Sequence, residues 1–400
     1  MQYRKNIKNN DELSLLGFGC MRYIRKGRSI DETATIALLR KAIDEGVNYF
    51  DTAYVYHGGK SETILGKALV GGYRQQVKIA TKMPRGLLFS YSDFDKLFNT
   101  QLEKLQTDYI DYYLIHRLVD MTSWEVLQRL GIEKWIKEKL ASRQIRNIGF
   151  SFHGQLREFE KLVDVYPWDF CQIQYNYIDT AIQAGTSGLK YAAAKGLPII
   201  IMEPLRGGKL ANHLPQEAVS LLKEKGLSPA ELALSWLFNL PEVTVVLSGM
   251  NSEAQLLENV AVSDKYPAAS LSASQLALTE EVKRIINKNV TIPCTGCRYC
   301  LPCPHGVDIP ACFNSYNEKD ALRSFGPLIT YVQNIGAFGP NPGSAGKCTN
   351  CQACLQHCPQ DIQIPQELAK IKKELEGVTF KLICWAARLR AKVKERRRKV

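Results

Sequence analysis

The chain has 400 residues, 45% hydrophobic and 23% charged, a composition typical of a soluble protein with one large domain and a smaller one. No apolar run is long enough to span a bilayer, and the N-terminal sequence MQYRKNIKNN lacks the apolar stretch of a signal peptide, so we expect a cytoplasmic protein. The net charge of +12 is concentrated from Lys381 to Lys399, and no basic stripe with interleaved aromatic residues precedes it, which argues against nucleic-acid binding.

Strands and helices alternate along the first 270 residues. Leu13 to Gly19 has the pattern of a strand, and an amphipathic helix from Ser29 ends before Gly46. A short buried strand follows from Val47 to Asp51. Further helices are expected at Ser61–Leu69, Ser92–Leu105, Ser123–Ala141, Gly154–Val165, Leu189–Ala194, Pro229–Phe238 and Glu253–Val262. The strands that alternate with them are expected at Val77–Thr81, Ile110–Ile115, Ile145–Phe150, Phe170–Ile173, Pro198–Met202 and Thr244–Leu247. Seven strand and helix pairs after the first predict an α/β fold of the (β/α)8 TIM barrel type.

An open dinucleotide-binding sheet is the competing α/β fold. Its fingerprint needs a third glycine after the first G-x-G, and Gly17-Phe18-Gly19 is followed by CMRYIRKG, without a glycine in register. The barrel is therefore the favoured interpretation.

Three predicted strands end on an ionisable residue. Asp51 follows Tyr49-Phe50, Lys82 ends the strand IATK, and His116 ends YYLIH, while Tyr56 lies five positions beyond Asp51. Each residue alone has an ordinary structural explanation, such as a helix cap or a core histidine. Because barrel enzymes carry their active sites at the C-terminal ends of the strands, the joint occurrence favours a catalytic site.

These four residues resemble the catalytic set of the aldo-keto reductases, barrel enzymes that use nicotinamide. The resemblance covers most of Leu13 to Val262. It implies reduction of a carbonyl to an alcohol, or the reverse. Tyr56 would donate the proton, Lys82 would lower its pKa, Asp51 would hold Lys82, and His116 would orient the carbonyl oxygen.

The same resemblance implies the cofactor contacts. Ser151 and Gln172 would bind the nicotinamide carboxamide, and the loop from Ser248 to Asn251, with Asn259 in the following helix, would take a phosphate. Three departures from the family pattern leave the choice between NADP and NAD open, and a flavin could occupy the same rim. They are Met202 in place of an aromatic residue, Phe152 in place of Asn, and Gln255 in place of a basic residue.

Eight of the 12 cysteines form two runs late in the chain. The second run has the bacterial ferredoxin spacing, and the first differs by having two residues, not three, before its last cysteine. We therefore expect two 4Fe-4S clusters, each completed by the last cysteine of the other run. Zinc is the alternative, but four ligands per zinc do not explain the triple runs. The predicted ligand sets are Cys294, Cys297, Cys300 with Cys358, and Cys348, Cys351, Cys354 with Cys303.

The predicted domains are a barrel at 1–270, a helical linker at 271–292, a small, mainly helical ferredoxin-type iron-sulfur domain at 293–365 and a basic amphipathic tail at 366–400. The tail could contact an anionic membrane peripherally, through Phe380, Ile383, Trp385 and Leu389, or dock on a partner.

Two functions remain open from the sequence. In the first, the chain is a carbonyl oxidoreductase coupled to its clusters and to a ferredoxin-like electron partner. In the second, it is an iron-sulfur electron-transfer protein that uses the barrel as a scaffold. The intact set Asp51, Tyr56, Lys82 and His116 favours the first.

Overall fold

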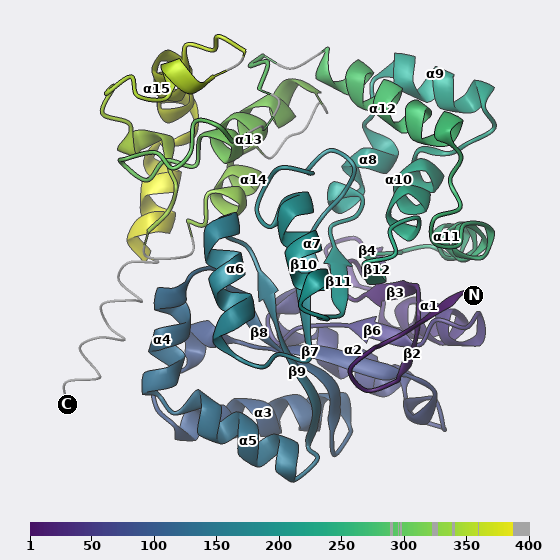
Figure 1. Cartoon of the computed structure of the whole chain (residues 1–400). Coiled ribbons are helices and arrows are strands. Elements are labelled where there is room, and N and C mark those ends of the chain that lie inside the picture. The colour runs from purple at the N-terminus through teal and green to yellow at the C-terminus, as the bar shows by residue number, and fades with distance from the viewer. Residues whose placement is uncertain are drawn as a thin grey trace.

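The structure, a computed structural model, describes residues 1–288, 291–294, 296, 298–321, 327–337, 341–358 and 360–386. Eight parallel strands close into a barrel in the order β10-β11-β12-β3-β6-β7-β8-β9, which confirms the predicted (β/α)8 fold (Figure 1). The barrel strands are β3 (Leu16–Gly19), β6 (Tyr49–Asp51), β7 (Lys78–Met83), β8 (Ile110–Leu118), β9 (Ile145–Phe152), β10 (Phe170–Gln174), β11 (Ile199–Met202) and β12 (Val243–Ser248).

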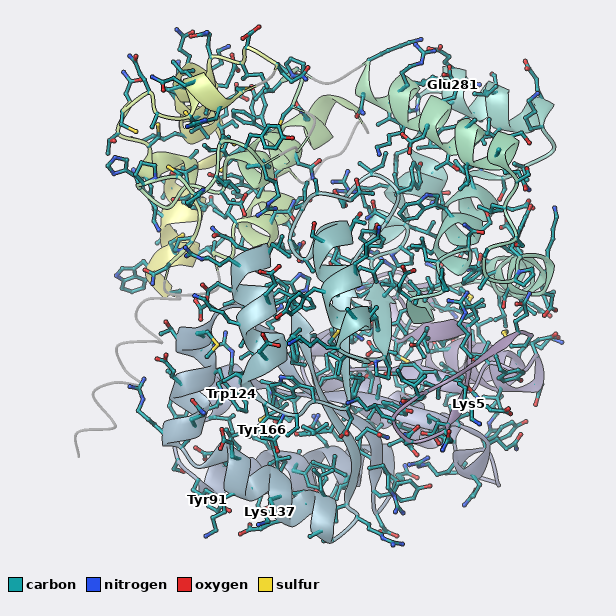
Figure 2. The ribbon with its side chains drawn as sticks, in the orientation of Figure 1. Lys5, Tyr91, Trp124, Lys137, Tyr166 and Glu281 are labelled. Atoms are coloured by element: carbon teal, nitrogen blue, oxygen red, sulfur yellow. The ribbon has the colours of Figure 1, made fainter. Side chains whose placement is uncertain are left out.

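Helices surround the barrel, and their apolar faces pack on the outward side of the strands. The barrel helices are α1 (Glu32–Asp44), α2 (Ser61–Ala68), α3 (Ser92–Leu105), α4 (Met121–Arg129), α5 (Ile132–Ala141), α6 (Leu156–Val165), α7 (Gly185–Ala194), α8 (Lys209–Asn212), α9 (Gln216–Glu224), α10 (Pro229–Phe238) and α11 (Glu253–Lys265). On this outer layer Trp124 of α4 and Tyr166 after α6 pack edge to face, with ring centroids 5.5 Å apart (Figure 2).

The helices differ from the sequence-based expectation in three main ways. The single helix expected from Ser123 to Ala141 is two helices, because Gly131 between them adopts a φ of 87°. Helix α1 begins after Asp31, whose carboxylate caps Ala34, and Ser29 belongs instead to the hairpin of β4 (Arg25–Lys26) and β5 (Ser29–Ile30). Helices α8 and α9 had not been expected.

Side chains alternate between the barrel interior and the surrounding helices, with the period of two that strands impose. In β6, Tyr49 belongs to the interior cluster and Phe50 to the cluster under the helices, so Asp51 points inward. In β7, Ala80 points inward, and Lys82 two positions later does the same. The alternation therefore directs the predicted catalytic residues into the same end of the barrel.

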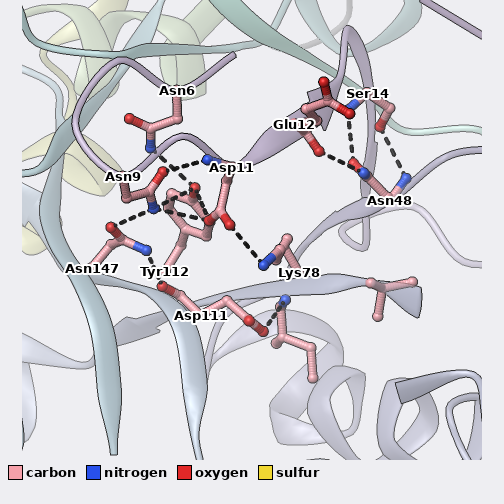
Figure 3. A network of polar contacts seen from close by, with 12 residues as sticks. Asn6, Asn9, Asp11, Glu12, Ser14, Asn48, Lys78, Asp111, Tyr112 and Asn147 are labelled. Atoms are coloured by element: carbon pink, nitrogen blue, oxygen red, sulfur yellow. Dashed lines mark hydrogen bonds and ion pairs between the residues drawn. The ribbon is translucent and has the colours of Figure 1, made fainter. Parts of the chain in front are cut away.

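The opposite end of the barrel is covered by the N-terminal hairpin of β1 (Tyr3–Lys5) and β2 (Glu12–Ser14), as Figure 3 shows. Tyr112 donates its hydroxyl proton to Asp11 over 2.8 Å, and Lys78 pairs with the same carboxylate at 2.8 Å. Asn6 also donates to Tyr112, over 3.0 Å. This network closes the N-terminal end, which leaves the C-terminal end as the place for a site.

Helix α12 (Ala273–Asn287), expected as part of a linker, packs on the outside of the barrel domain. Its Val282, Ile285 and Ile286 share an apolar cluster with Leu222 of α9 and Leu232 of α10. This packing extends beyond residue 270, and the proposed domain boundaries remain a prediction.

The C-terminal domain has its own apolar core, built on α13 (Ile309–Ala321), α14 (Pro327–Asn334) and α15 (Ile364–Leu375). It lies against the loop between β10 and α7 (Figure 1). Arg298 donates to the carbonyl of Ala181 over 2.8 Å, and Asn314 of α13 donates to Asp179 over 3.0 Å. No helix among the described residues is both long and apolar enough to cross a membrane.

Candidate active site and cysteine cavities

Lys82 lies at the centre of the four residues predicted to be catalytic. Its ammonium is 2.5 Å from Asp51 Oδ1, 2.8 Å from the carbonyl of Thr52 and 3.3 Å from the hydroxyl of Tyr56. Only 1% of the Lys82 side chain and 5% of that of Asp51 are exposed, so this ion pair is shielded from water. The structure thus brings Asp51, Lys82 and Tyr56 into one connected group.

Tyr56 lies at the start of a short 3-10 turn, Tyr56–Gly59, five residues after the end of β6. The ring of the following residue, His57, stacks on Tyr23 with centroids 4.8 Å apart, which holds this loop against the barrel. Burial raises the pKa of Tyr56, while the nearby Lys82 and Arg117 cations oppose that shift. Lys82 therefore lowers the pKa of Tyr56 as expected, but burial raises it by more, so the net pKa of Tyr56 is above its ordinary value.

His116 faces Tyr56 across the mouth of the barrel, with ring centroids 6.2 Å apart and an edge-to-face arrangement. Burial, together with the Lys82 and Arg117 cations, holds the pKa of His116 well below its usual range. The imidazole is therefore neutral at pH 7, the state that can donate a hydrogen bond to a carbonyl oxygen without carrying charge.

Burial lowers the pKa of Lys82, but the attraction of Asp51 and Tyr56 is stronger, and the net pKa is raised. Lys82 therefore remains an ammonium at neutral pH. A charged lysine beside a phenol stabilises the phenolate that forms when Tyr56 gives up its proton.

Gln172 and Ser151, predicted to bind nicotinamide, both lie on the inner wall at the same end of the barrel. Gln172 donates its amide to Asp51 Oδ2 over 2.8 Å, and its own Oε1 is buried without a hydrogen-bond partner among the described residues. Ser151 accepts a bond from the backbone of Arg117, over 2.9 Å, which leaves its hydroxyl proton available. One acceptor and one donor fit the two ends of a carboxamide, so these residues suit the nicotinamide group.

The predicted phosphate loop lies after β12. Asn259 donates to Ser248 over 2.9 Å, and the backbone N-H of Asn251 bonds to Gln255 Oε1 over 3.0 Å. Gln255 therefore orders this loop, although it brings no positive charge.

Arg22 supplies a positive charge beside the predicted phosphate loop. This residue was not predicted from the sequence. A methyl group placed on Gly207 would lie 2.4 Å from Arg22 Nη2, and one on Gly249 would lie 3.1 Å from its Cδ. Arg22 therefore touches both the loop after β11 and the loop after β12. It belongs to the first strand-to-helix connection, so only the closed barrel brings it there.

Arg117 and His153 also lie near the reacting groups and were not predicted. The pairing of β8 with β9 shifts register between Ile115 and Leu118, and Arg117 within this irregularity has a φ of 54°. His153 follows the end of β9, and burial lowers its pKa to about 3, so it is neutral at pH 7. The sequence alone gives no signal that Arg117 and His153 lie here, because neither residue belongs to a recognised motif.

Five cysteines from the two runs line one cavity of about 250 Å³ in the C-terminal domain. Four of them are the second predicted ligand set, Cys303, Cys348, Cys351 and Cys354, and the fifth is Cys300 of the first set. Among the described residues, no three His, Cys, Asp or Glu side chains are arranged to hold a single metal ion. The four thiols around a wider space suit a larger cluster better than a tetrahedral zinc.

The described members of the first set, Cys294, Cys300 and Cys358, line a smaller cavity of about 20 Å³ together with Arg298 and Phe313. Cys297, the remaining predicted ligand, lies outside the described residues. Arg298 is also the residue that bonds to Ala181 of the barrel. The first set therefore faces the barrel, while the second includes Cys351, which is exposed.

Comparison with known proteins agrees with this architecture. Residues 15–283 match the model of the Aldo/keto reductase family, and residues 293–362 match that of a 4Fe-4S dicluster domain. An L-galactose dehydrogenase from Arabidopsis thaliana is 28% identical, over 70% of this chain and 94% of its own. The aldo-keto reductase YhdN of Bacillus subtilis is 27% identical, over 56% of this chain and 77% of its own.

Solved structures show the same barrel. The holo form of the aldo-keto reductase AKR11C1 from Bacillus halodurans has a TM-score of 0.59 and 25% identity, covering 70% of this chain and 96% of its own. An aldo/keto reductase from Klebsiella pneumoniae, solved in complex with NADP and acetate, has a TM-score of 0.58 and 22% identity, covering 71% and 96%. The chain belongs to the aldo/keto reductase family, and it is an oxidoreductase whose barrel is followed by a 4Fe-4S dicluster domain.

Proposed function

We propose that this protein interconverts a small-molecule carbonyl and its alcohol by hydride exchange with a nicotinamide cofactor at the C-terminal end of the barrel. The observation that carries the proposal is the position of Lys82, whose ammonium contacts both the Asp51 carboxylate and the Tyr56 hydroxyl. Hydride transfer to a carbonyl leaves an alkoxide, which must take a proton from a nearby weak acid. Tyr56 is that acid, and the ammonium of Lys82 stabilises the phenolate left behind.

His116 and Gln172 have separate duties in this proposal. Neutral His116 donates a hydrogen bond to the carbonyl oxygen and directs it towards Tyr56. Gln172 accepts from the carboxamide of the nicotinamide through Oε1, which has no hydrogen-bond partner in the described part of the chain, while its amide holds Asp51. Ser151 donates to the other end of the carboxamide.

For the cofactor we propose NADP in preference to NAD. The Klebsiella pneumoniae structures contain NADP or NADPH. In this chain the phosphate groups would be held by the loop from Ser248 to Asn251, by Asn259 and by Arg22, which supplies the charge that Gln255 lacks.

We further propose that the C-terminal domain holds two 4Fe-4S clusters on the predicted ligand sets. When bound, such clusters supply one-electron transfer. The set of Cys294, Cys297, Cys300 and Cys358 is on the side that meets the barrel, through Arg298. The other set includes the exposed Cys351 and lies next to the exposed Tyr299, and here we propose the contact with a ferredoxin-like electron partner.

Replacing Tyr56 by Phe tests the catalytic assignment. The variant should lose carbonyl reduction by about 10²- to 10⁴-fold, the usual contribution of a general acid, while NADPH binds within about twofold of the unchanged protein. Tyr54→Phe is the matched control, since Tyr54 lies in the same loop but packs against Lys104, and it should keep its turnover. The measurements are NADPH oxidation with a panel of aldehydes and NADPH fluorescence titration, both without oxygen.

Retained turnover in Tyr56→Phe would contradict the assignment. An absorption spectrum of the same preparation would show whether a flavin is also bound.

A further inference from the structure

The segment 378–386 forms a helix at the outer edge of the C-terminal domain (Figure 1). One side of this helix is anchored in the domain core. Phe380 is 5% exposed and packs on Tyr331 with ring centroids 5.6 Å apart, and Cys384 is 7% exposed. Phe380 therefore cannot enter a membrane without leaving the core, which corrects the sequence-based expectation that it would do so. Leu389, which was also expected to contact the membrane, lies outside the described residues.

The other side of the helix presents an apolar stripe, formed by Val378, Leu382 and Trp385. These side chains are 75%, 57% and 62% exposed, respectively. Their spacing of four and then three residues places them on one face of the helix. No other helix in the described part of the chain exposes more than one large apolar side chain. The stripe is thus a concentrated apolar surface on a helix that the core holds in place.

Strong positive charge follows the stripe in the sequence. Lys381, within the helix, is exposed, and the sequence from 387 to 400 contains eight Lys or Arg residues and one acid, Glu395. Leu389 and Val393 continue the apolar spacing of three to four residues among those basic residues. Apolar side chains that include a tryptophan, with basic residues around them, are typical of elements that lie in the interface of an anionic membrane. An acidic protein surface would attract the basic residues, but a charged surface offers no apolar environment for Val378, Leu382 and Trp385.

We propose that Val378, Leu382 and Trp385 form a peripheral contact with the surface of an anionic membrane. The apolar stripe lies among the lipid headgroups, and the positive charge of the exposed Lys381 and of the sequence that follows attracts anionic lipids. This contact is independent of the proposed catalytic function, because the residues that form it belong to neither the barrel site nor the cysteine cavities.

Tryptophan fluorescence gives a direct test. Trp124, Trp135 and Trp168 are at most 2% exposed, and Trp236 is partly buried in the barrel domain, so Trp385 is the tryptophan placed to meet lipid. Vesicles of phosphatidylcholine and phosphatidylglycerol carrying bromine on the acyl chains should quench the fluorescence of the anaerobic full-length protein. Vesicles of phosphatidylcholine alone should not, and added salt should weaken the quenching because it screens the charges.

Variants separate the stripe from the charge. Leu382→Glu should reduce co-sedimentation with the anionic vesicles at least tenfold, while Trp385→Phe should abolish quenching and keep most of the binding. The matched control is Leu276→Glu on α12, where a single leucine is 38% exposed, and it should bind as the unchanged protein does. Unchanged binding of Leu382→Glu, binding without quenching in the unchanged protein, or no binding to anionic vesicles at low salt would each overturn the proposal.

Discussion

Gln172 and Asp51, which are 121 positions apart in the chain, are joined by a hydrogen bond of 2.8 Å inside the barrel. Both side chains are buried, and the same Asp51 carboxylate pairs with Lys82 through its other oxygen. Gln172 therefore connects the residues proposed to bind nicotinamide with those proposed to move the proton. A change at Gln172 should affect cofactor binding and the acid group together.

Replacing Gln172 by Ala should weaken NADPH binding about tenfold, because a carboxamide N-H of the cofactor would lose its buried acceptor. Turnover at saturating NADPH should also fall, since Asp51 would lose one of its two side-chain partners. Gln76→Ala is a suitable control, as Gln76 is exposed in the turn before β7. Fluorescence titration and steady-state kinetics measure the two effects, and an unchanged dissociation constant would remove Gln172 from the cofactor site.

Replacing Lys82 by Met should abolish carbonyl reduction and destabilise the barrel by about 3–5 kcal/mol, because Asp51 would be left as an unpaired buried charge. Lys78→Met changes the same strand at its other end, where the pair with Asp11 is partly exposed and contributes at most about 1 kcal/mol.

The double variant Asp51→Asn, Lys82→Met separates stability from catalysis. It should regain most of the stability measured by urea denaturation, because no buried charge remains unpaired, and it should stay inactive. Recovery of activity in the double variant would show that Lys82 acts only on the fold.

The stability of the barrel should fall as pH decreases below about 6.5, in part because of His153. Its pKa is about 3 in the folded protein and near the ordinary value of about 6.5 in the unfolded chain, so the unfolded chain binds a proton between these values and the folded protein does not. Stability from this group is therefore complete above pH 6.5 and is lost progressively as pH falls.

Replacing His153 by Gln should remove about 1 kcal/mol of the loss in unfolding free energy between pH 7.5 and 5.5, as measured by urea denaturation. His213→Gln, at an exposed histidine after α8, is the matched control for the loss of an imidazole. An identical pH dependence in His153→Gln and the unchanged protein would show that His153 takes up its proton in the folded state as readily as in the unfolded one.

Protein purified without oxygen should contain about eight iron atoms per chain. Cys351→Ala should reduce this to about four, because it removes one ligand from the set around the larger cavity. Cys312→Ala is the control, since Cys312 is buried in the same domain but bonds to Tyr331 and Gly343, and its iron content should stay near eight. Zinc with negligible iron, by elemental analysis, would contradict the cluster assignment.

The barrel could be predicted from the sequence because the alternation of strands and helices and the inward period of two are local properties. Asp51 ends β6, and Lys82 and His116 lie within two residues of the ends of β7 and β8, so one rule about barrels was enough to expect them at the same rim. The two cysteine runs have fixed spacings and could be recognised in the same way.

Other features depend on contacts that no local pattern contains. Arg22 reaches the loops after β11 and β12 only because the barrel closes, and Asn314 meets Asp179 across 135 positions. The break at Gly131 depends on its positive φ, since apolar residues continue at helical spacing on both sides. At 378–386 the amphipathic pattern has two apolar faces, and only the position of the domain core shows that Phe380 is on the inner one.

The most direct test of the central claim follows the hydride itself. NADPH deuterated at C4 on the transferring face would be mixed without oxygen with a single equivalent of a small aldehyde and a slight excess of enzyme. The alcohol product would then be analysed by mass spectrometry. Hydride transfer at the Tyr56 and Lys82 site predicts one deuterium on the carbinol carbon of the product. It also predicts that Tyr56→Phe forms little or none of this deuterated alcohol. An alcohol that forms without deuterium from either face of the nicotinamide would contradict the proposed reaction.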